Sequence, residues 1–132
     1  MNLVLDTNVW LSATLWNGSV AQKLLAKIIM SDVEIYVSTK IIEEYTKVLK
    51  RDFRYTDEQI IEKVNYIKSI AELINPSEVL NIVQDDPTDD RIIECAIESS
   101  SKYIITYDKH LLNLKSYQGI LIVKPEEARV IF

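Results

Sequence analysis

The chain has 132 residues, one cysteine and a net charge of −5. This length suffices for one buried core but not for two, so we expect a single domain over residues 1–132. The composition excludes a disulfide-stabilised secreted scaffold and predicts a cytoplasmic protein, and no apolar run approaches the ~20 residues of a membrane span.

Short apolar runs alternate with longer runs of helical period along the chain. Residues 3–5 predict a buried strand, and a loop is expected after it. In chain order, the further predicted elements are a helix at 18–31, a strand at 33–37, a helix from Ser38 or Thr39 to about 52, a helix from Thr56 to about 70, a strand at 71–74, a helix from Asp86-Pro87 to near 101, a strand at 103–106, a short helix at 109–113, a strand at 120–123 and a short helix at 126–130.

Strands that alternate with helices indicate βαβ units, which build a parallel sheet covered by helices on both faces. In such sheets ligands bind beyond the carboxyl ends of the strands. Two acids stand there, because Asp6 ends the first strand and Asp108 comes two residues after Thr106 in the fourth. This edge of the sheet is therefore where we expect the chemistry.

Two further acids lean toward the interior from predicted helices. Glu44 lies at the edge of the apolar stripe that contains Ile41 and Tyr45, whereas Glu43 faces water. Asp89 lies near the centre of the stripe of the helix after Pro87. On that helix we expect Asp90 at the margin of the stripe, and Glu94 and Glu98 pointing outward.

Inward-leaning carboxylates need a neutralising partner, and neither stripe contains a lysine or arginine. A divalent cation is the simplest partner. Oxygen ligands without a Cys/His set favour Mg²⁺ or Mn²⁺ over Zn²⁺. Such ions promote phosphodiester hydrolysis, so the pattern favours a metal-dependent nuclease. Each acid has a structural alternative: Asp6 could end its strand in a turn, and Asp108 could cap the short helix that follows. Glu44 could be a snorkelling residue at the edge of its stripe. Asp89 could support an Asp86 cap, and geometry alone does not rank Asp89 over Asp86.

Short motifs along the whole chain resemble those of the PIN-domain family. Val-Leu-Asp-Thr-Asn-Val at 4–9 is similar to the opening motif, and Ser38 followed by Glu44 to the second. Residues 86–96 resemble the D-P-x-D segment with its helix, residues 104–112 the late T-x-D motif, and residues 117–125 the closing strand with its proline.

The resemblance implies an α/β fold, a three-layer α/β/α sandwich with a central parallel five-stranded sheet. It also implies Mg²⁺- or Mn²⁺-dependent cleavage of single-stranded RNA, as in VapC-type toxins, which an antitoxin neutralises and which form homodimers. On this reading the metal ligands and catalytic residues are Asp6, Glu44, Asp89 and Asp108, and the residues that orient them are Thr7, Asn8 and Thr106.

The net acidity argues against simple electrostatic binding of RNA. The acids are concentrated in residues 56–101, however, and the end of the second predicted helix is basic. The predicted phosphate contacts there are Lys47, Lys50, Arg51 and Arg54. A solvated helix end is the alternative interpretation of these cations.

For the remaining candidates the structural role is favoured. We expect His110 at an ordinary surface position rather than on a phosphate, and Cys95 in the core. Trp10 and Trp16, beside the loop after the first strand, are expected in the core rather than stacked on bases.

Three other classes compete with the nuclease. A phosphoacceptor receiver domain would need an aspartate after the third strand, where Asn75 stands. A D-x-D phosphatase would need an acid at Asn8. A PIN-like module without activity should lack at least one of the four acids, and all four are present.

Overall fold

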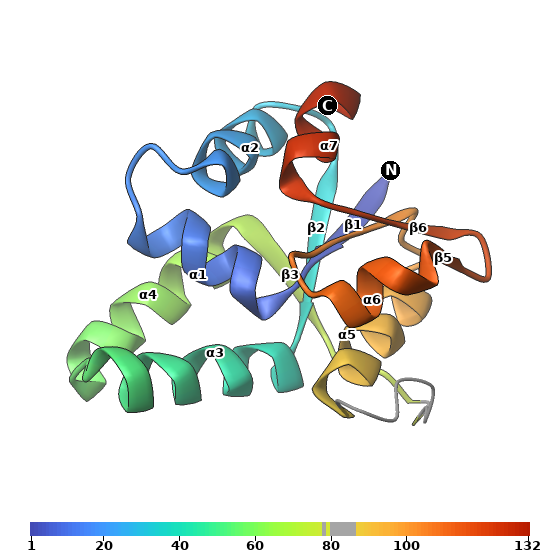
Figure 1. Ribbon diagram of the computed structural model, residues 1–132. Helices are drawn as coiled ribbons and strands as arrows, with labels where there is room; N and C mark the ends of the chain where they lie inside the picture. Colours follow the sequence, from blue (N-terminus) through green and yellow to red (C-terminus); the bar gives the residue numbers. More distant parts are fainter. Residues whose placement is uncertain (78, 80–86) are drawn as a thin grey trace.

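A single twisted sheet forms the centre of the computed structural model, which describes residues 1–77, 79 and 87–132 (Figure 1). Within these residues the strand order is β3-β2-β1-β4-β6-β5. The first five strands in this order run parallel, and the short β5 pairs antiparallel with β6. The strands are β1 (Asn2–Leu5), β2 (Glu34–Ser38), β3 (Ala71–Ile74), β4 (Tyr103–Ile105), β5 (Ser116–Tyr117) and β6 (Ile120–Val123). The predicted α/β sandwich with five parallel strands is thus confirmed, with one short edge strand added.

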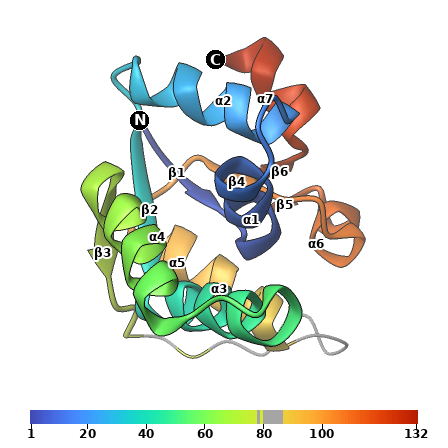
Figure 2. The same cartoon turned by 90° about the vertical axis from the view of Figure 1, so that its left-hand side faces the viewer.

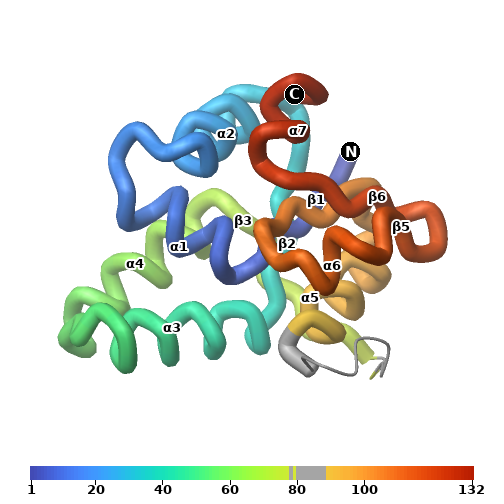
Figure 3. The backbone as a smooth tube through the Cα atoms, in the orientation of Figure 1, coloured from blue at the N-terminus to red at the C-terminus, as the bar shows by residue number. Residues whose placement is uncertain are grey.

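Helices cover both faces of this sheet. The helices are α1 (Thr7–Leu15), α2 (Val20–Ile29), α3 (Thr39–Phe53), α4 (Asp57–Ile70), α5 (Pro87–Glu98), α6 (Lys109–Leu114) and α7 (Pro125–Ile131). Figures 1 and 2 show α1, α2 and α7 on one side of the strands and α5 on the other. The path of the backbone in Figure 3 shows that α3 and α4 form a hairpin beside the sheet. Within the described ranges, no helix combines the length and apolarity that a bilayer crossing requires.

Most predicted elements are present with ends shifted by a few residues. Ser38 caps α3 by accepting a hydrogen bond from the Ile41 N–H, and Thr56 and Gln59 form the capping box that opens α4. The helix predicted from Asp86-Pro87 begins at Pro87 and ends at Glu98, and Asp86 lies outside the described residues.

The prediction of a loop after the first strand is wrong, because residues 7–15 form α1. This helix packs against α2 and α3, and Val9, Trp10, Leu11 and Ala13 are all buried. A helix buried around most of its circumference has no polar stripe, so periodicity does not reveal it. Trp10 is in the core as predicted. The prediction for Trp16 is wrong, because it is half exposed at the end of α1, with its ring edge-to-face against Phe53.

The register of β1 and β4 brings the ends of the two strands together. Leu5 pairs with Ile105, so the next residues, Asp6 and Thr106, are neighbours at the carboxyl edge of the sheet. The Asp6 N–H donates to the Ile105 carbonyl at 2.9 Å and extends this pairing by one step. The strand residues beneath are fully buried, which holds this edge in place.

A candidate metal centre at the carboxyl edge of the sheet

A cleft of about 400 Å³ is lined by α1, α3 and α5 and by the residues that follow β1 and precede α6. The four acids singled out by the sequence all line it, each from a different segment. These are Asp6 after β1, Glu44 on α3, Asp89 in the first turn of α5, and Asp108 before α6. The expectation that these side chains converge at one edge of the sheet therefore agrees with the geometry.

Asp6 is buried, and each of its carboxylate oxygens accepts a hydrogen bond. Its Oδ1 accepts from the Thr7 N–H at 2.7 Å, so the side chain caps α1. Its Oδ2 accepts from the Thr106 hydroxyl at 2.6 Å. Two short bonds to a buried carboxylate fix its orientation toward the cleft.

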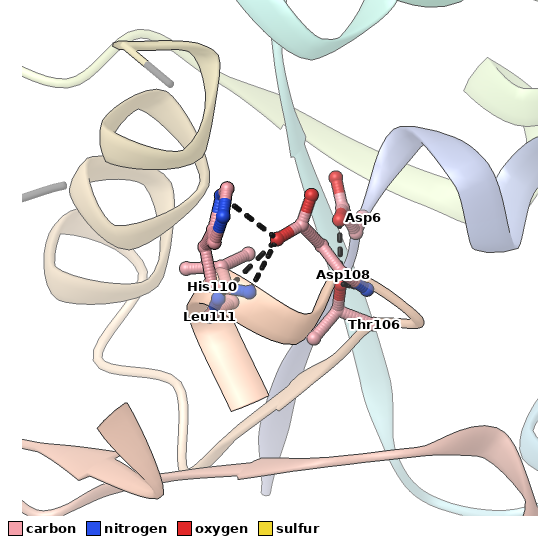
Figure 4. Close-up of polar contacts among 5 residues, drawn as sticks. All are labelled: Asp6, Thr106, Asp108, His110 and Leu111. Atoms are coloured by element: carbon pink, nitrogen blue, oxygen red, sulfur yellow. Dashed lines mark hydrogen bonds and ion pairs between the residues drawn. The ribbon is translucent and has the colours of Figure 1, made fainter. Parts of the chain in front are cut away.

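Thr106 connects Asp6 to Asp108. Its Oγ1 donates to Asp6 and accepts from the Asp108 N–H at 2.9 Å. Asp108 caps α6, because its Oδ1 accepts from the N–H groups of His110 and Leu111 at 2.7 and 3.4 Å. Figure 4 shows the other carboxylate oxygen of Asp108 on the same side as the Asp6 carboxylate. One buried hydroxyl thus contacts the Asp6 carboxylate and the backbone of Asp108.

The other predicted orienting residues contact the same segment. Thr7 acts on Asp6 through its backbone, and its side chain lines the cleft. The Asn8 Oδ1 accepts from the Tyr107 N–H at 3.4 Å and so connects α1 to the loop before Asp108. The Tyr107 hydroxyl donates to Glu126 on α7 at 2.9 Å. Burial, and secondly this bond to Glu126, raise the pKa of Tyr107 to about 12, so it remains a donor at neutral pH.

Two expectations for α5 were wrong. Glu94 is buried rather than pointing outward, and it forms a 2.8 Å ion pair with Arg91. Asp90 is also buried rather than marginal. Glu98 is exposed as predicted. Helical spacing predicted which α5 side chains face a single buried stripe. The helix contacts β1, β2, β4 and α3, so side chains outside that stripe are buried as well.

The cations at the cleft are only partly those that the sequence indicated. Lys47 lines the cleft, whereas Lys50 lies 3.6 Å from Asp57 and Arg51 2.8 Å from Asp52. Arg54 is exposed in the left-handed conformation that ends α3. Two cleft cations were missed, Lys40 and Arg91. Lys40 stands seven residues before Lys47, and this two-turn spacing on α3 could have indicated a shared face.

The donors at this edge suit a hard divalent cation. Asp89, Asp108 and His110 each offer one ligand atom, and these atoms lie within 4.8 Å of one another. Asp6 and Glu44 add carboxylates from the same cleft. Carboxylate oxygens are the ligands that Mg²⁺ and Mn²⁺ prefer, so the residues present fit such an ion.

Cys95 is fully buried, as predicted. Burial raises the pKa of its thiol to about 12, against a smaller opposite effect of a hydrogen bond with Ser38. The thiol is therefore protonated at neutral pH and contributes packing rather than a metal ligand.

Comparisons with known proteins agree with this arrangement. Residues 2–110 match the family model described as a PIN domain. The chain is also 30% identical over 119 residues to an uncharacterized protein of Methanocaldococcus jannaschii, covering 87% of this chain and 76% of the relative.

Two solved structures are similar in fold. VapBC2 from Rickettsia felis, bound to a DNA fragment from its promoter, gives a TM-score of 0.70 at 17% identity, over 94% of this chain and 98% of the other. VapBC-1 from nontypeable Haemophilus influenzae gives a TM-score of 0.63 at 15% identity, over 96% and 99%.

Proposed function

The chain belongs to the PIN-domain family, and from this premise we propose that it is an endoribonuclease that hydrolyses phosphodiester bonds of single-stranded RNA. The proposed cofactor is Mg²⁺ or Mn²⁺, held by Asp6, Glu44, Asp89 and Asp108. The observation that carries the proposal is the convergence of these four carboxylates in one cleft.

A divalent ion bound there would polarise the scissile phosphate and lower the pKa of an attacking water. The chain's own residues contribute orientation. Thr106 and the N–H of Thr7 fix the Asp6 carboxylate, and the caps at the start of α1 and α6 hold Asp6 and Asp108 in place before any ligand arrives. Such preorganisation spares the cost of ordering the ligands during catalysis.

Binding of the substrate is assigned to the cations at the cleft. Lys40, Lys47 and Arg91 line it beside the acids. Lys40 lies 3.8 Å from the exposed Glu43 and Arg91 pairs with Glu94, so we assign the contact with the phosphates that flank the scissile bond first to Lys47. Lys50 and Arg51 are close to exposed acids, and we assign them no more than a distant contribution. A cationic margin around an acidic centre reconciles the net charge of −5 with a polyanionic substrate.

We further propose a cytoplasmic toxin that forms a homodimer and is neutralised by an antitoxin. The motif resemblance to VapC-type toxins and the two structural neighbours, both VapBC assemblies, support this partner. Co-purification with the product of a short neighbouring reading frame, together with loss of RNA cleavage in the complex, would be the expected result.

The receiver-domain alternative has no support in the geometry. β3 is an edge strand, and the residue after it is Asn75, so a phosphoacceptor carboxylate is missing from the position where that class needs one. Among the described residues, the acids instead gather beyond β1 and β4 at the centre of the sheet.

The test is cleavage of a labelled single-stranded RNA with Mn²⁺, compared between wild type, Asp108→Asn and Glu62→Gln. Asparagine keeps the cap of α6 but removes the charge. Glu62 is exposed on α4 and is not among the residues that line the cleft, so its variant is matched in charge. We expect chelator-sensitive cleavage by wild type and Glu62→Gln and its loss in Asp108→Asn. Equal cleavage by all three would assign the activity to a contaminant and refute the proposal.

A further inference from the structure

His110 lies at the start of α6, two residues after Asp108, and is the single histidine of the chain. The sequence favoured an ordinary surface position, and its side chain is indeed 39% exposed. Its surroundings are nevertheless specific. The imidazole Nδ1 lies 3.9 Å from Asp108 Oδ1, and a ligand atom of the ring lies within 4.8 Å of both Asp89 and Asp108.

Asp108 separates His110 from Asp6. Thr106 binds both Asp6 and the Asp108 N–H on one side, and the imidazole faces Asp108 on the other (Figure 4). A ligand atom of Asp89, from the first turn of α5, lies within 4.8 Å of ligand atoms of both Asp108 and His110. Within the described residues these three ligand atoms therefore lie close together, and Asp6 and Glu44 line the same cleft.

We propose that His110 is a nitrogen ligand of a divalent cation that Asp89 and Asp108 also bind, which makes the centre selective for Mn²⁺ over Mg²⁺. The inference rests on the proposed metal-dependent function and adds a ligand to the four carboxylates. The backbone favours this role, because the hydrogen bond from the His110 N–H to the Asp108 carboxylate holds the His110 backbone beside that carboxylate.

The selectivity follows from the chemistry of the donors. Imidazole nitrogen suits first-row transition metals, whereas Mg²⁺ prefers oxygen ligands and keeps several of its waters. An imidazole added to the carboxylates therefore raises the affinity of the centre for Mn²⁺ and changes its affinity for Mg²⁺ little. The alternative is a weak surface pair between the imidazole and Asp108, with no metal involved.

Pulsed electron paramagnetic resonance of Mn²⁺ bound to the full chain tests this directly. The chain is prepared without a histidine tag, so an imidazole ¹⁴N coupling can come from His110 alone. We expect the coupling in wild type and in Lys109→Gln, which changes the exposed neighbour, and its loss in His110→Asn. By calorimetry, His110→Asn should weaken Mn²⁺ binding by about tenfold or more and Mg²⁺ binding by less than about threefold.

The outcomes separate this inference from the proposed function. Mn²⁺ that binds wild type without a ¹⁴N coupling, or with a coupling that survives in His110→Asn, overturns the histidine ligand and leaves the carboxylate centre intact. Failure of wild type to bind Mn²⁺ overturns both. Circular dichroism and the melting temperature without metal establish that the variants are folded.

Discussion

Replacing Thr106 with valine removes one hydroxyl from the centre of the site and little else. Valine has nearly the same shape, so no cavity is created at this fully buried position. Two hydrogen bonds disappear, the 2.6 Å bond to Asp6 and the 2.9 Å bond from the Asp108 N–H. A bond to a charged group contributes about 1.5–3 kcal/mol and a neutral bond about 0.5–1.5 kcal/mol. We therefore expect Thr106→Val to lower the free energy of unfolding by about 2–4 kcal/mol.

Thr106→Ser is the matched control. Serine keeps the hydroxyl and loses one buried methyl group, which costs about 1 kcal/mol. Urea denaturation measures the free energy of unfolding, and calorimetry measures Mn²⁺ affinity. We expect a Mn²⁺ affinity about 10–100-fold lower for Thr106→Val and nearly unchanged for Thr106→Ser. If valine is tolerated as well as serine in both measurements, the hydroxyl does not orient the acids and the reasoning is refuted.

Three further outcomes follow from the structure. Lys47→Ala should raise the KM for RNA and make the slope of log affinity against log salt concentration smaller by about 0.7. Lys50→Ala should change neither quantity, and equal effects of the two substitutions would contradict the assignment of Lys47 to the cleft. Cys95 should resist a thiol reagent at pH 8, below its raised pKa of about 12, and react only after unfolding; rapid labelling of the native chain would contradict its burial. In urea denaturation, Trp10→Phe should cost more stability than Trp16→Phe, because only Trp10 is fully buried; the reverse order would contradict the core.

The sequence predicted the fold well where segments have one exposed face. The stripe of α3, the capping box of α4 and the short apolar runs of β1 and β6 each follow from local periodicity or capping. Periodicity failed for α1, which is buried on most sides, and for β5, whose two residues are too few for a pattern. Both depend on tertiary packing rather than on the local sequence.

In the candidate site, too, some features follow from the local sequence and others depend on tertiary packing. The positions of Asp6 and Asp108 follow from strand ends and a parallel sheet, and that of Glu44 from helical geometry. The approach of His110 to Asp89 depends on how α5 and α6 meet in space, and no spacing in the sequence encodes the distance between those two helices. The ion pair between Arg91 and Glu94, in contrast, joins residues three apart on α5, so helical spacing could have indicated it.

Calorimetric titration of Mn²⁺ into the wild type, Asp6→Asn and Glu62→Gln tests the central claim most directly. The claim is that the acids in the cleft share a divalent ion. Asparagine keeps one carbonyl oxygen, so it can still accept from the Thr7 N–H and cap α1. Its amide nitrogen cannot accept the Thr106 hydroxyl as Oδ2 does, so the variant loses this hydrogen bond together with the charge. Wild type and Glu62→Gln should bind with equal affinity, and Asp6→Asn should bind at least about tenfold more weakly. Unchanged binding by Asp6→Asn, or no binding by wild type, would contradict the account.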